Sequence, residues 1–248
     1  VQGRKTEDFV ANILEPEVTG EFLLGYEEVN NPEWFEPHAG LDESGKGDLF
    51  GPVVTACVVA DGDMVRDWMN SGVRDSKTIT DGAILKMAKQ IKDTKGVVVK
   101  VAYTNMIKYN ELYLQFDSNL NKFLAWLHGR SLNDAIKERK PTWGLLDQFT
   151  KQPLVQKYVE GQDFDLQMRT KAEEDPVVAA ASIIARATWL QQMKKLGELA
   201  GCVLPKGSGS QAKEKATSLY NKFGEEGMKE FCKLHFKTAY EAIGKKPL

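Results

Sequence analysis

Cysteine and histidine are scarce in this sequence, and their scarcity argues against several kinds of site. The 248 residues include three cysteines, which lie far apart and form no CxxC pair. We therefore do not expect a zinc ribbon or a thioredoxin-like redox site. We expect a protein that is cytoplasmic and whose cysteines are reduced. The three histidines are equally scattered, and we interpret each as a structural or surface residue rather than as a metal ligand.

Long apolar runs and an ATP-binding loop are also missing. No run approaches the roughly 18 apolar residues of a membrane-spanning helix, and the polar first residues do not resemble a secretory signal. The glycine-rich stretch Ser44–Asp48 lacks the GxxxxGK[ST] spacing of a phosphate-binding loop for ATP. With 42% hydrophobic and 27% charged residues, the chain is expected to be a globular protein without a membrane partner, and we predict a monomer.

Positive charge is not in excess, since the net charge is −2, which argues against a protein that coats nucleic acid by bulk electrostatics. One segment differs: residues 206–246 contain nine lysines and five glutamates, a local charge of +4. This segment is either a pair of solvated helices or a basic face for nucleic acid. For the second case, the candidates for phosphate contacts are Lys213, Lys222, Lys229 and Lys233.

The hydrophobic pattern alternates between strands and helices after residue 38. Apolar runs predict a short strand that ends in the glycine-rich turn of 39–48, and further strands at 51–60, 97–103, 142–149 and 164–170. Helical spacing predicts helices at 81–93, 118–137, 176–194, 211–223 and 225–235. The alternation indicates an α/β domain with a mixed sheet over 39–248, preceded by an N-terminal appendage at 1–38.

Three acidic residues lie where apolar strands are predicted to end. Asp42 and Glu43 follow Leu41 just before the glycine-rich turn, and Asp147 closes another apolar run. A carboxylate at the end of a buried strand is unfavourable unless it is paired or bound to a cation. Carboxylates that converge from neighbouring strand ends favour a hard divalent cation and support two-metal hydrolysis of a phosphodiester. The alternative is an ordinary solvated acidic pair beside a turn.

The glycine-rich turn Ser44-Gly45-Lys46-Gly47 has two interpretations. A short turn of this kind presents backbone N–H groups to a phosphate and allows a close approach to a sugar edge. It is equally compatible with a simple β-turn. The two glycines also permit the strand to end or bulge, which is what would bring the adjacent Asp42 and Glu43 to one site.

The ordered set of motifs resembles the type 2 ribonucleases H, and most closely the bacterial ribonuclease HIII branch. GLDESGKGDLFGPVV (Gly40–Val54) is similar to the motif that opens their catalytic domain, and Asp147-Gln148-Phe149 is similar to the DQF of the HIII branch. The further resemblances are Arg74-Asp75-Ser76-Lys77 with Thr80, Tyr109-Asn110, Asn119-Leu120-Asn121, Leu124–His128, Ala179–Arg186, Leu204-Pro205-Lys206-Gly207 and Lys233-Leu234-His235-Phe236.

The resemblance implies an α/β, ribonuclease H-like fold with a mixed central sheet flanked by helices and a C-terminal helical segment. It implies cleavage of the RNA strand of RNA/DNA hybrids with two Mg²⁺ or Mn²⁺ ions, leaving 5′-phosphate and 3′-hydroxyl ends. The implied metal ligands and catalytic acids are Asp42, Glu43, Asp147 and Glu173. The implied substrate-binding residues are Ser44, Gly45, Lys46, Gly47, Ser76, Lys77 and Lys206.

Two positions depart from the family pattern. The stretch between Glu173 and the AAAS motif is one residue shorter than expected, so Glu174 or Asp175 is an alternative fourth acid. The HIII branch usually carries a larger N-terminal substrate-binding domain, of which residues 1–38 would be a remnant.

Two other functions compete with this reading. One is ribonuclease HII-like cleavage at single ribonucleotides in duplex DNA, which relies on a C-terminal tyrosine; Tyr220 and Tyr240 are present, but neither lies in a matching motif. The other is a non-catalytic nucleic-acid-binding module, which predicts that the acids are missing.

Overall fold

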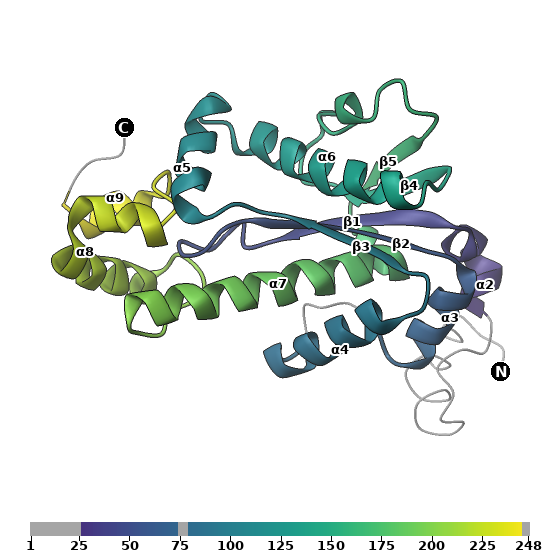
Figure 1. Ribbon diagram of the computed structural model, residues 1–248, viewed down its shortest axis with the longest axis horizontal. Helices are drawn as coiled ribbons and strands as arrows, with labels where there is room; N and C mark the ends of the chain where they lie inside the picture. Colours follow the sequence, from purple (N-terminus) through teal and green to yellow (C-terminus); the bar gives the residue numbers. More distant parts are fainter. Residues whose placement is uncertain (1–25, 74–78, 245–248) are drawn as a thin grey trace, which may run out of the picture.

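The computed structural model describes residues 26–73 and 79–244, which form a five-stranded sheet with helices on both faces (Figure 1). The strands, in chain order, are β1 His38–Ser44, β2 Val54–Ala60, β3 Val98–Ala102, β4 Trp143–Asp147 and β5 Asp165–Arg169. Their order across the sheet is β3-β2-β1-β4-β5. β1, β2 and β3 pair antiparallel, whereas β4 pairs parallel to β1 and β5 parallel to β4. The predicted mixed sheet is confirmed.

The helices cover the two faces of the sheet unequally. α6 packs on β2 and β3 from one face, and α7 runs along β1 and β2 on the other, with α4 outside it (Figure 1). The chain continues into α8 and α9 at one end of the sheet. The helices are α2 Tyr26–Asn30, α3 Gly62–Asn70, α4 Asp81–Asp93, α5 Met106–Gln115, α6 Leu120–Glu138, α7 Pro176–Ala200, α8 Ser210–Phe231 and α9 Lys237–Ala242. Short 3-10 helices are η2 Pro32–Phe35, η4 Gln156–Tyr158 and η5 Ala172–Glu174.

Both sides of the sheet are apolar, as the β-branched runs predict. All seven residues of β2 are buried. Val54, Ala56 and Val58 contribute to the core beneath α7, whereas Cys57 and Val59 contribute to the core beneath α6. Successive residues of a strand point to opposite faces, so the same alternation decides which helix each polar residue of β1 meets.

α7 is fixed against β1 at its first turn. The helix begins with Pro176 after Asp175, whose carboxylate accepts hydrogen bonds from the backbone N–H groups of Val177 and Val178. Asp175 is fully buried and also meets His38 at the start of β1, with 3.1 Å between Nε2 and Oδ1. A side chain at Gly40 would collide with the backbone of Val177 at 2.4 Å, so strand and helix are in close contact here.

Most predicted elements are present, with shifted ends. The predicted helix 81–93 agrees with α4 at both ends, whereas α7 extends six residues beyond the predicted 194. The predicted helices 211–223 and 225–235 correspond to the two halves of α8, which the non-helical backbone of Gly224 separates, and the second half ends at Phe231. α3, α5 and α9 were not predicted from periodicity, because each is short and amphipathic over only two or three turns. The predicted appendage 1–38 lies largely outside the described residues; its described part contains α2 and η2.

Candidate functional site

Asp42 and Asp147 lie side by side at the ends of two parallel strands. The register between β1 and β4 pairs Leu41 with Leu146, so the next residues, Asp42 and Asp147, stand at the same level. Both lie on the face of the sheet that α7 covers: the side chain of Ser182 in α7 hydrogen-bonds Asp42, and the N–H of Ala172 donates to Asp147 Oδ1 at 3.0 Å. The predicted convergence of carboxylates from neighbouring strand ends is present for this pair.

The pKa of Asp42 reflects burial first and nearby negative charge second. Burial raises the pKa of Asp42 to about 7, and the negative charges of Glu43 and Asp147 add to the increase. Hydrogen bonds from Ser182 and from the backbone N–H of Glu43 oppose it without cancelling it. A carboxyl group in this position binds a proton near neutral pH or, if a cation is offered, exchanges the proton for the cation.

Glu43 is on the other face of the sheet, beneath α6. Its carboxylate lies 3.1 Å from Nε2 of the buried His128 in α6 and 3.7 Å from Nζ of Lys46. His128 and Lys46 both contact the ring of Phe149. The ring centroids of His128 and Phe149 are 5.3 Å apart, and Nζ of Lys46 lies 5.6 Å from the centroid of Phe149. β1 continues to Ser44 without a bulge, so Asp42 and Glu43 keep the usual alternation and reach the strand end from opposite faces.

The three candidates for the fourth acid have different surroundings. Glu173 lies in η5, directly after Ala172, the residue that donates to Asp147. Glu174 is exposed. Asp175 is buried in the cap of α7 with three hydrogen bonds, and its geometry is that of a structural residue.

The glycine-rich turn lies flat on α7. Gly45 and Gly51 have positive φ angles of 87° and 77°. A side chain at Gly45 would collide with Trp189 at 2.4 Å, and one at Gly51 would collide with Met193 at 2.6 Å. These two glycines are therefore required by the fold itself. Gly47 is different, because it is exposed and a side chain there would meet nothing within 4 Å. Its bare backbone faces outward, where a ligand has room to approach.

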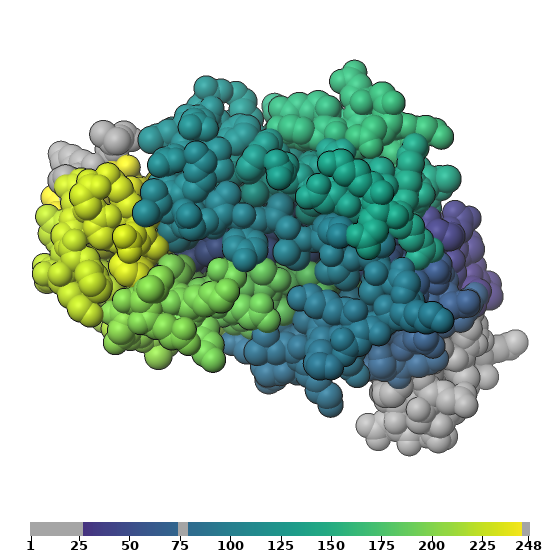
Figure 2. Space-filling view, in the orientation of Figure 1, coloured from purple at the N-terminus to yellow at the C-terminus, as the bar shows by residue number. Residues whose placement is uncertain are grey.

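The remaining predicted substrate-binding residues are only partly placed. Ser44 ends β1 and is half-buried. Lys206 is exposed and forms an ion pair with Asp81 at the start of α4. Ser76 and Lys77 lie outside the described residues. In the space-filling view, the dark-blue early part of the chain is visible at the bottom of a furrow between the teal helices and the green α7 (Figure 2).

The four lysines that were candidates for phosphate contacts in the basic segment are buried or bound to other groups of the protein. The prediction for Lys233 is wrong: the side chain is fully buried, because its ammonium is used inside the protein. Lys213 pairs with Glu241 at 3.2 Å, and Lys229 pairs with Glu226 at 2.6 Å. Lys222 donates to the carbonyl oxygen of Ala200 at 3.1 Å. Much of the local positive charge is thus balanced within the segment.

The carboxylates are not drawn together around one point. Within residues 26–73 and 79–244, no group of three or more His, Cys, Asp or Glu side chains is arranged to hold a metal ion. The same part of the chain contains no helix that is long and apolar enough to cross a membrane.

Comparison with known proteins identifies the family. The sequence profile of the ribonuclease HII family matches residues 39–239. Ribonuclease HIII of Protochlamydia amoebophila is 36% identical over 99% of this chain and 80% of its own length, and Ribonuclease HIII of Chlamydia caviae is 37% identical over 97% and 80%. This chain belongs to the type 2 ribonuclease H family. The resemblance to the ribonuclease HIII branch is confirmed by these relatives.

Solved structures of type 2 ribonucleases H share the fold. Bst-RNase HIII in complex with Mn²⁺ has a TM-score of 0.77 and 32% identity over 85% of this chain and 70% of its own. RNase H3 of Aquifex aeolicus has a TM-score of 0.68 and 28% identity over 94% of this chain and 79% of its own. The ribonuclease H-like fold predicted from the motifs is confirmed.

Two residues of this type 2 ribonuclease H site were not predicted. Ser182 hydrogen-bonds Asp42, and His128 contacts Glu43. Both lie within motifs that carry the family resemblance, but an isolated serine or histidine on an apolar helix face gives no sign of which strand it meets. The available signal for Ser182 and for His128 was that each is a polar residue in an otherwise apolar stretch of helix whose neighbouring residues are buried.

Proposed function

We propose that this chain hydrolyses the RNA strand of RNA/DNA hybrids with Asp42, Glu43, Asp147 and Glu173 as its metal-binding acids. Family membership supports the reaction. One observation carries the assignment of the site: burial, and after it the negative charges of Glu43 and Asp147, raise the pKa of Asp42 to about 7. A divalent cation relieves this repulsion and prefers oxygen ligands.

The donor set fits Mg²⁺ or Mn²⁺, because it consists of carboxylate oxygens and contains no cysteine. When bound, two such ions supply an activated water and stabilise the leaving 3′ oxygen, which yields 5′-phosphate and 3′-hydroxyl ends. The crystal structure of Bst-RNase HIII in complex with Mn²⁺ supports metal binding by this fold.

Each acid has a different role in this proposal. Asp42 and Asp147 form the centre of the site, since they share one face and one level of the sheet. Glu43 approaches from the α6 face, where His128 and Lys46 orient its carboxylate. Glu173 is the fourth acid, because η5 places it next to the residue that hydrogen-bonds Asp147, whereas Asp175 already serves α7 and His38.

Substrate binding is assigned to the glycine-rich turn and to two lysine-containing motifs. The outward backbone of Gly47 gives a sugar or phosphate room to approach, and Lys46 and Ser44 flank it. Ser76 and Lys77 belong to the proposal through their motif alone. Lys206 would have to exchange Asp81 for a phosphate. Residues 1–38 are proposed to be an appendage or the remnant of a substrate-binding domain, joined to the catalytic domain 39–248; a monomeric state stays a prediction.

A cleavage assay with two substrates tests the function. A uniform RNA/DNA hybrid and a DNA duplex with a single ribonucleotide are compared in Mg²⁺, in Mn²⁺ and in EDTA. We expect cleavage of the hybrid with either ion and none in EDTA. Preferred cleavage at the single ribonucleotide would replace the proposal by the ribonuclease HII-like activity, and cleavage that persists in EDTA would exclude the metal mechanism.

A further inference from the structure

The second half of the glycine-rich turn is held by a segment from the far end of the chain. The strap, as we call Cys232–Phe236, follows α8 directly. Phe50 and Cys232 form an antiparallel bridge, and the backbone N–H of Lys233 donates to the carbonyl oxygen of Leu49 at 2.8 Å. The N–H of Gly51 donates to the carbonyl oxygen of Phe231 at 3.3 Å. The strap thus pairs with the turn like a short extra strand.

Lys233 reinforces this pairing from inside the protein. Its ammonium group donates to the carbonyl oxygens of Asp48, at 2.7 Å, and of Gly51. It also lies over the rings of Tyr109 and Phe236, 5.5 and 5.9 Å from their centroids. The side chain has no exposed surface. One cation therefore bridges the two ends of the 48–51 stretch, immediately after the outward-facing Gly47.

A lysine in this place is unfavourable for stability alone. Burial lowers its pKa to about 7, which means that the protein environment works against the charged form. The two carbonyl oxygens and the aromatic faces compensate in part. An apolar residue of similar length fills such a space without the loss of hydration, so the hydrogen bonds to the turn are what distinguishes lysine from methionine here.

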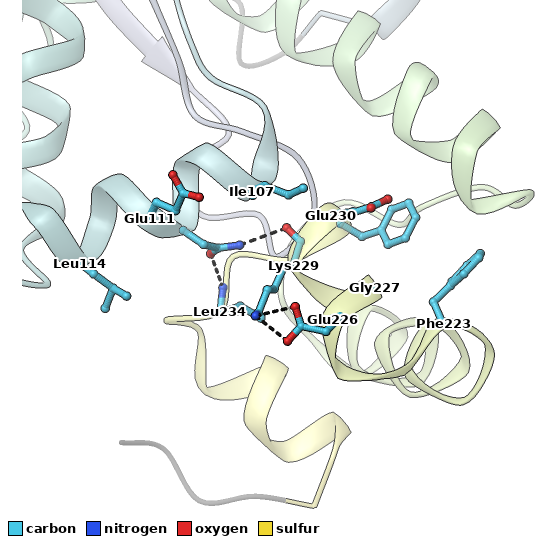
Figure 3. Close-up of a pocket in the computed structure, with 11 residues that line it drawn as sticks. Ile107, Glu111, Leu114, Phe223, Glu226, Gly227, Lys229, Glu230 and Leu234 are labelled. Carbon is cyan, nitrogen blue, oxygen red and sulfur yellow. Dashed lines mark hydrogen bonds and ion pairs between the residues drawn. The ribbon is translucent and has the colours of Figure 1, made fainter.

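The strap is fixed in turn by α5. Asn110 accepts a hydrogen bond from the N–H of Leu234 at 2.9 Å and donates to the carbonyl oxygens of Cys232 and Lys229 at 3.0 and 3.2 Å. Figure 3 shows the bonds to Leu234 and to Lys229, at the edge of a hollow between α5 and α8. Tyr109 adds a contact of 3.1 Å between its hydroxyl group and Nε2 of His235.

We propose that Lys233 is a positioning residue for substrate binding: it holds the turn after Gly47 in the shape that meets the nucleic-acid backbone. The proposal rests on the proposed function, in which the turn binds substrate. It gives the Lys233–Phe236 and Tyr109-Asn110 motifs a shared task, since α5 fixes the strap and the strap fixes the turn. Lys233 acts through main-chain carbonyls and contacts no substrate, in contrast to the phosphate contact that its position in a basic segment suggests.

The test replaces Lys233 by methionine, which keeps the length and removes the donors. Lys237→Met is the matched control, because Lys237 follows in the same segment, is 78% exposed and pairs with Glu241. We expect Lys233→Met to raise KM for a uniform hybrid about tenfold, equivalent to about 1.4 kcal/mol of binding free energy. kcat should change little, the melting temperature should hold or rise, and Lys237→Met should match the parent chain.

Amide hydrogen exchange gives a readout that does not depend on activity. The amides of Leu49 and Gly51 donate hydrogen bonds to the carbonyl oxygens of Gly207 and Phe231. Loss of the Lys233 ammonium should accelerate hydrogen exchange at these two amides by about tenfold or more. The amides of β2 should keep the parent rate. Unchanged exchange in the turn would overturn the proposal even if the chain cleaved nothing.

Two outcomes separate this proposal from the proposed function. If the parent chain fails to cleave hybrid in Mg²⁺ or Mn²⁺, the proposed function fails, and the exchange measurement still decides whether Lys233 holds the turn. If the parent cleaves and Lys233→Met has an unchanged KM, the positioning role is wrong. If Lys233→Met does not fold, Asn110→Ala replaces it, because this variant loosens the strap while Lys233 stays in place. We expect Asn110→Ala to raise KM less than Lys233→Met would. An unchanged KM of Asn110→Ala would also reject the proposal.

Discussion

The acids at the ends of β1 and β4 and the buried Asp175 have neighbours of opposite kinds. Asp175 faces a histidine whose Nδ1 donates to the carbonyl oxygen of Glu36 at 2.7 Å and whose Nε2 lies 3.1 Å from the carboxylate. Both ring nitrogens of His38 thus lie within hydrogen-bond distance of an oxygen atom, and one of these oxygens belongs to Asp175. Asp42 instead has Glu43 and Asp147 as its charged neighbours.

The difference separates a structural carboxylate from one that serves a ligand. Asp175 receives its partners from the fold, because two backbone N–H groups and a buried histidine all meet its Oδ1, while its Oδ2 is buried without a hydrogen-bond partner among the described residues. The acids around Asp42 gain by binding a positive charge from outside the chain. Sequence proximity alone hides this distinction, because Glu173 and Asp175 are only two residues apart.

The largest effect is expected for Asp147→Asn, which removes one charge from the acidic cluster. Cleavage of the hybrid should be abolished, a loss of more than about 100-fold. The amide oxygen still accepts the hydrogen bond from Ala172, and repulsion with Asp42 disappears, so the melting temperature without metal should hold or rise. Asp165→Asn, at the start of the neighbouring β5, is the control. Parent-level turnover by Asp147→Asn would remove this residue from the site.

The second effect distinguishes Glu173 from its neighbour. Glu173→Gln should lower kcat about 100-fold, as expected for a metal ligand or its direct support. Glu174→Gln is the matched control in the same 3-10 helix, and its rate should stay close to that of the parent because the side chain is exposed. If instead Glu174→Gln is inactive and Glu173→Gln is active, the assignment of the fourth acid is reversed while the reaction class stands.

The third effect tests the structural side of the comparison. Asp175→Ala removes the cap of α7 and leaves the buried Nε2 of His38 without its hydrogen-bond partner, so the free energy of unfolding should fall by about 3 kcal/mol. Asp61→Ala is the control, since Asp61 caps α3 in a more exposed position and its loss should cost about 1 kcal/mol. Urea denaturation measures both. The kcat of folded Asp175→Ala should change little, and a complete loss would assign Asp175 to the chemistry.

The smallest effect is the dependence of stability on pH without metal. Because the pKa of Asp42 is raised from 3.8 to about 7, the folded chain binds a proton that the unfolded chain has released between these values. In EDTA the free energy of unfolding should therefore fall as pH rises from about 4 to 7, by about 1 kcal/mol or more, and then level off. The difference between the parent and Asp42→Asn isolates this contribution. A difference that is flat across the window would contradict the charge coupling of Asp42.

The sequence predicted the sheet better than the site. The β-branched run of β2 and the apolar runs of β4 and β5 locate strands because burial on both faces leaves a continuous signal. Asp42, Asp147 and the turn follow from where these runs stop. The relation between Asp42 and Glu43 did not follow, because only the pairing of β1 up to Ser44 shows that the two acids reach the strand end from opposite faces.

The basic segment shows why other parts were beyond prediction. The sequence shows the charge of a lysine but not whether its side chain is buried or exposed. Lys233 is in the core, whereas Lys213 and Lys229 form ion pairs on the surface. Gly224, whose φ of 70° is outside the helical region, separates the two halves of α8 at the boundary between the two predicted helices. The burial of Lys233 depends on contacts with Asp48 and Gly51, which are 185 and 182 positions away in the chain and which periodicity does not record.

The bond between Lys233 and Asp48 joins positions 185 residues apart in the chain. During synthesis, the turn emerges well before the strap, and the contact between them closes only after the residues that separate them have been made. The acids of β1 and β4 can therefore be in place on a nascent chain before the turn has its final shape. We expect a folding intermediate of this kind to have a formed sheet and little affinity for substrate, so that the last residues to fold switch on binding.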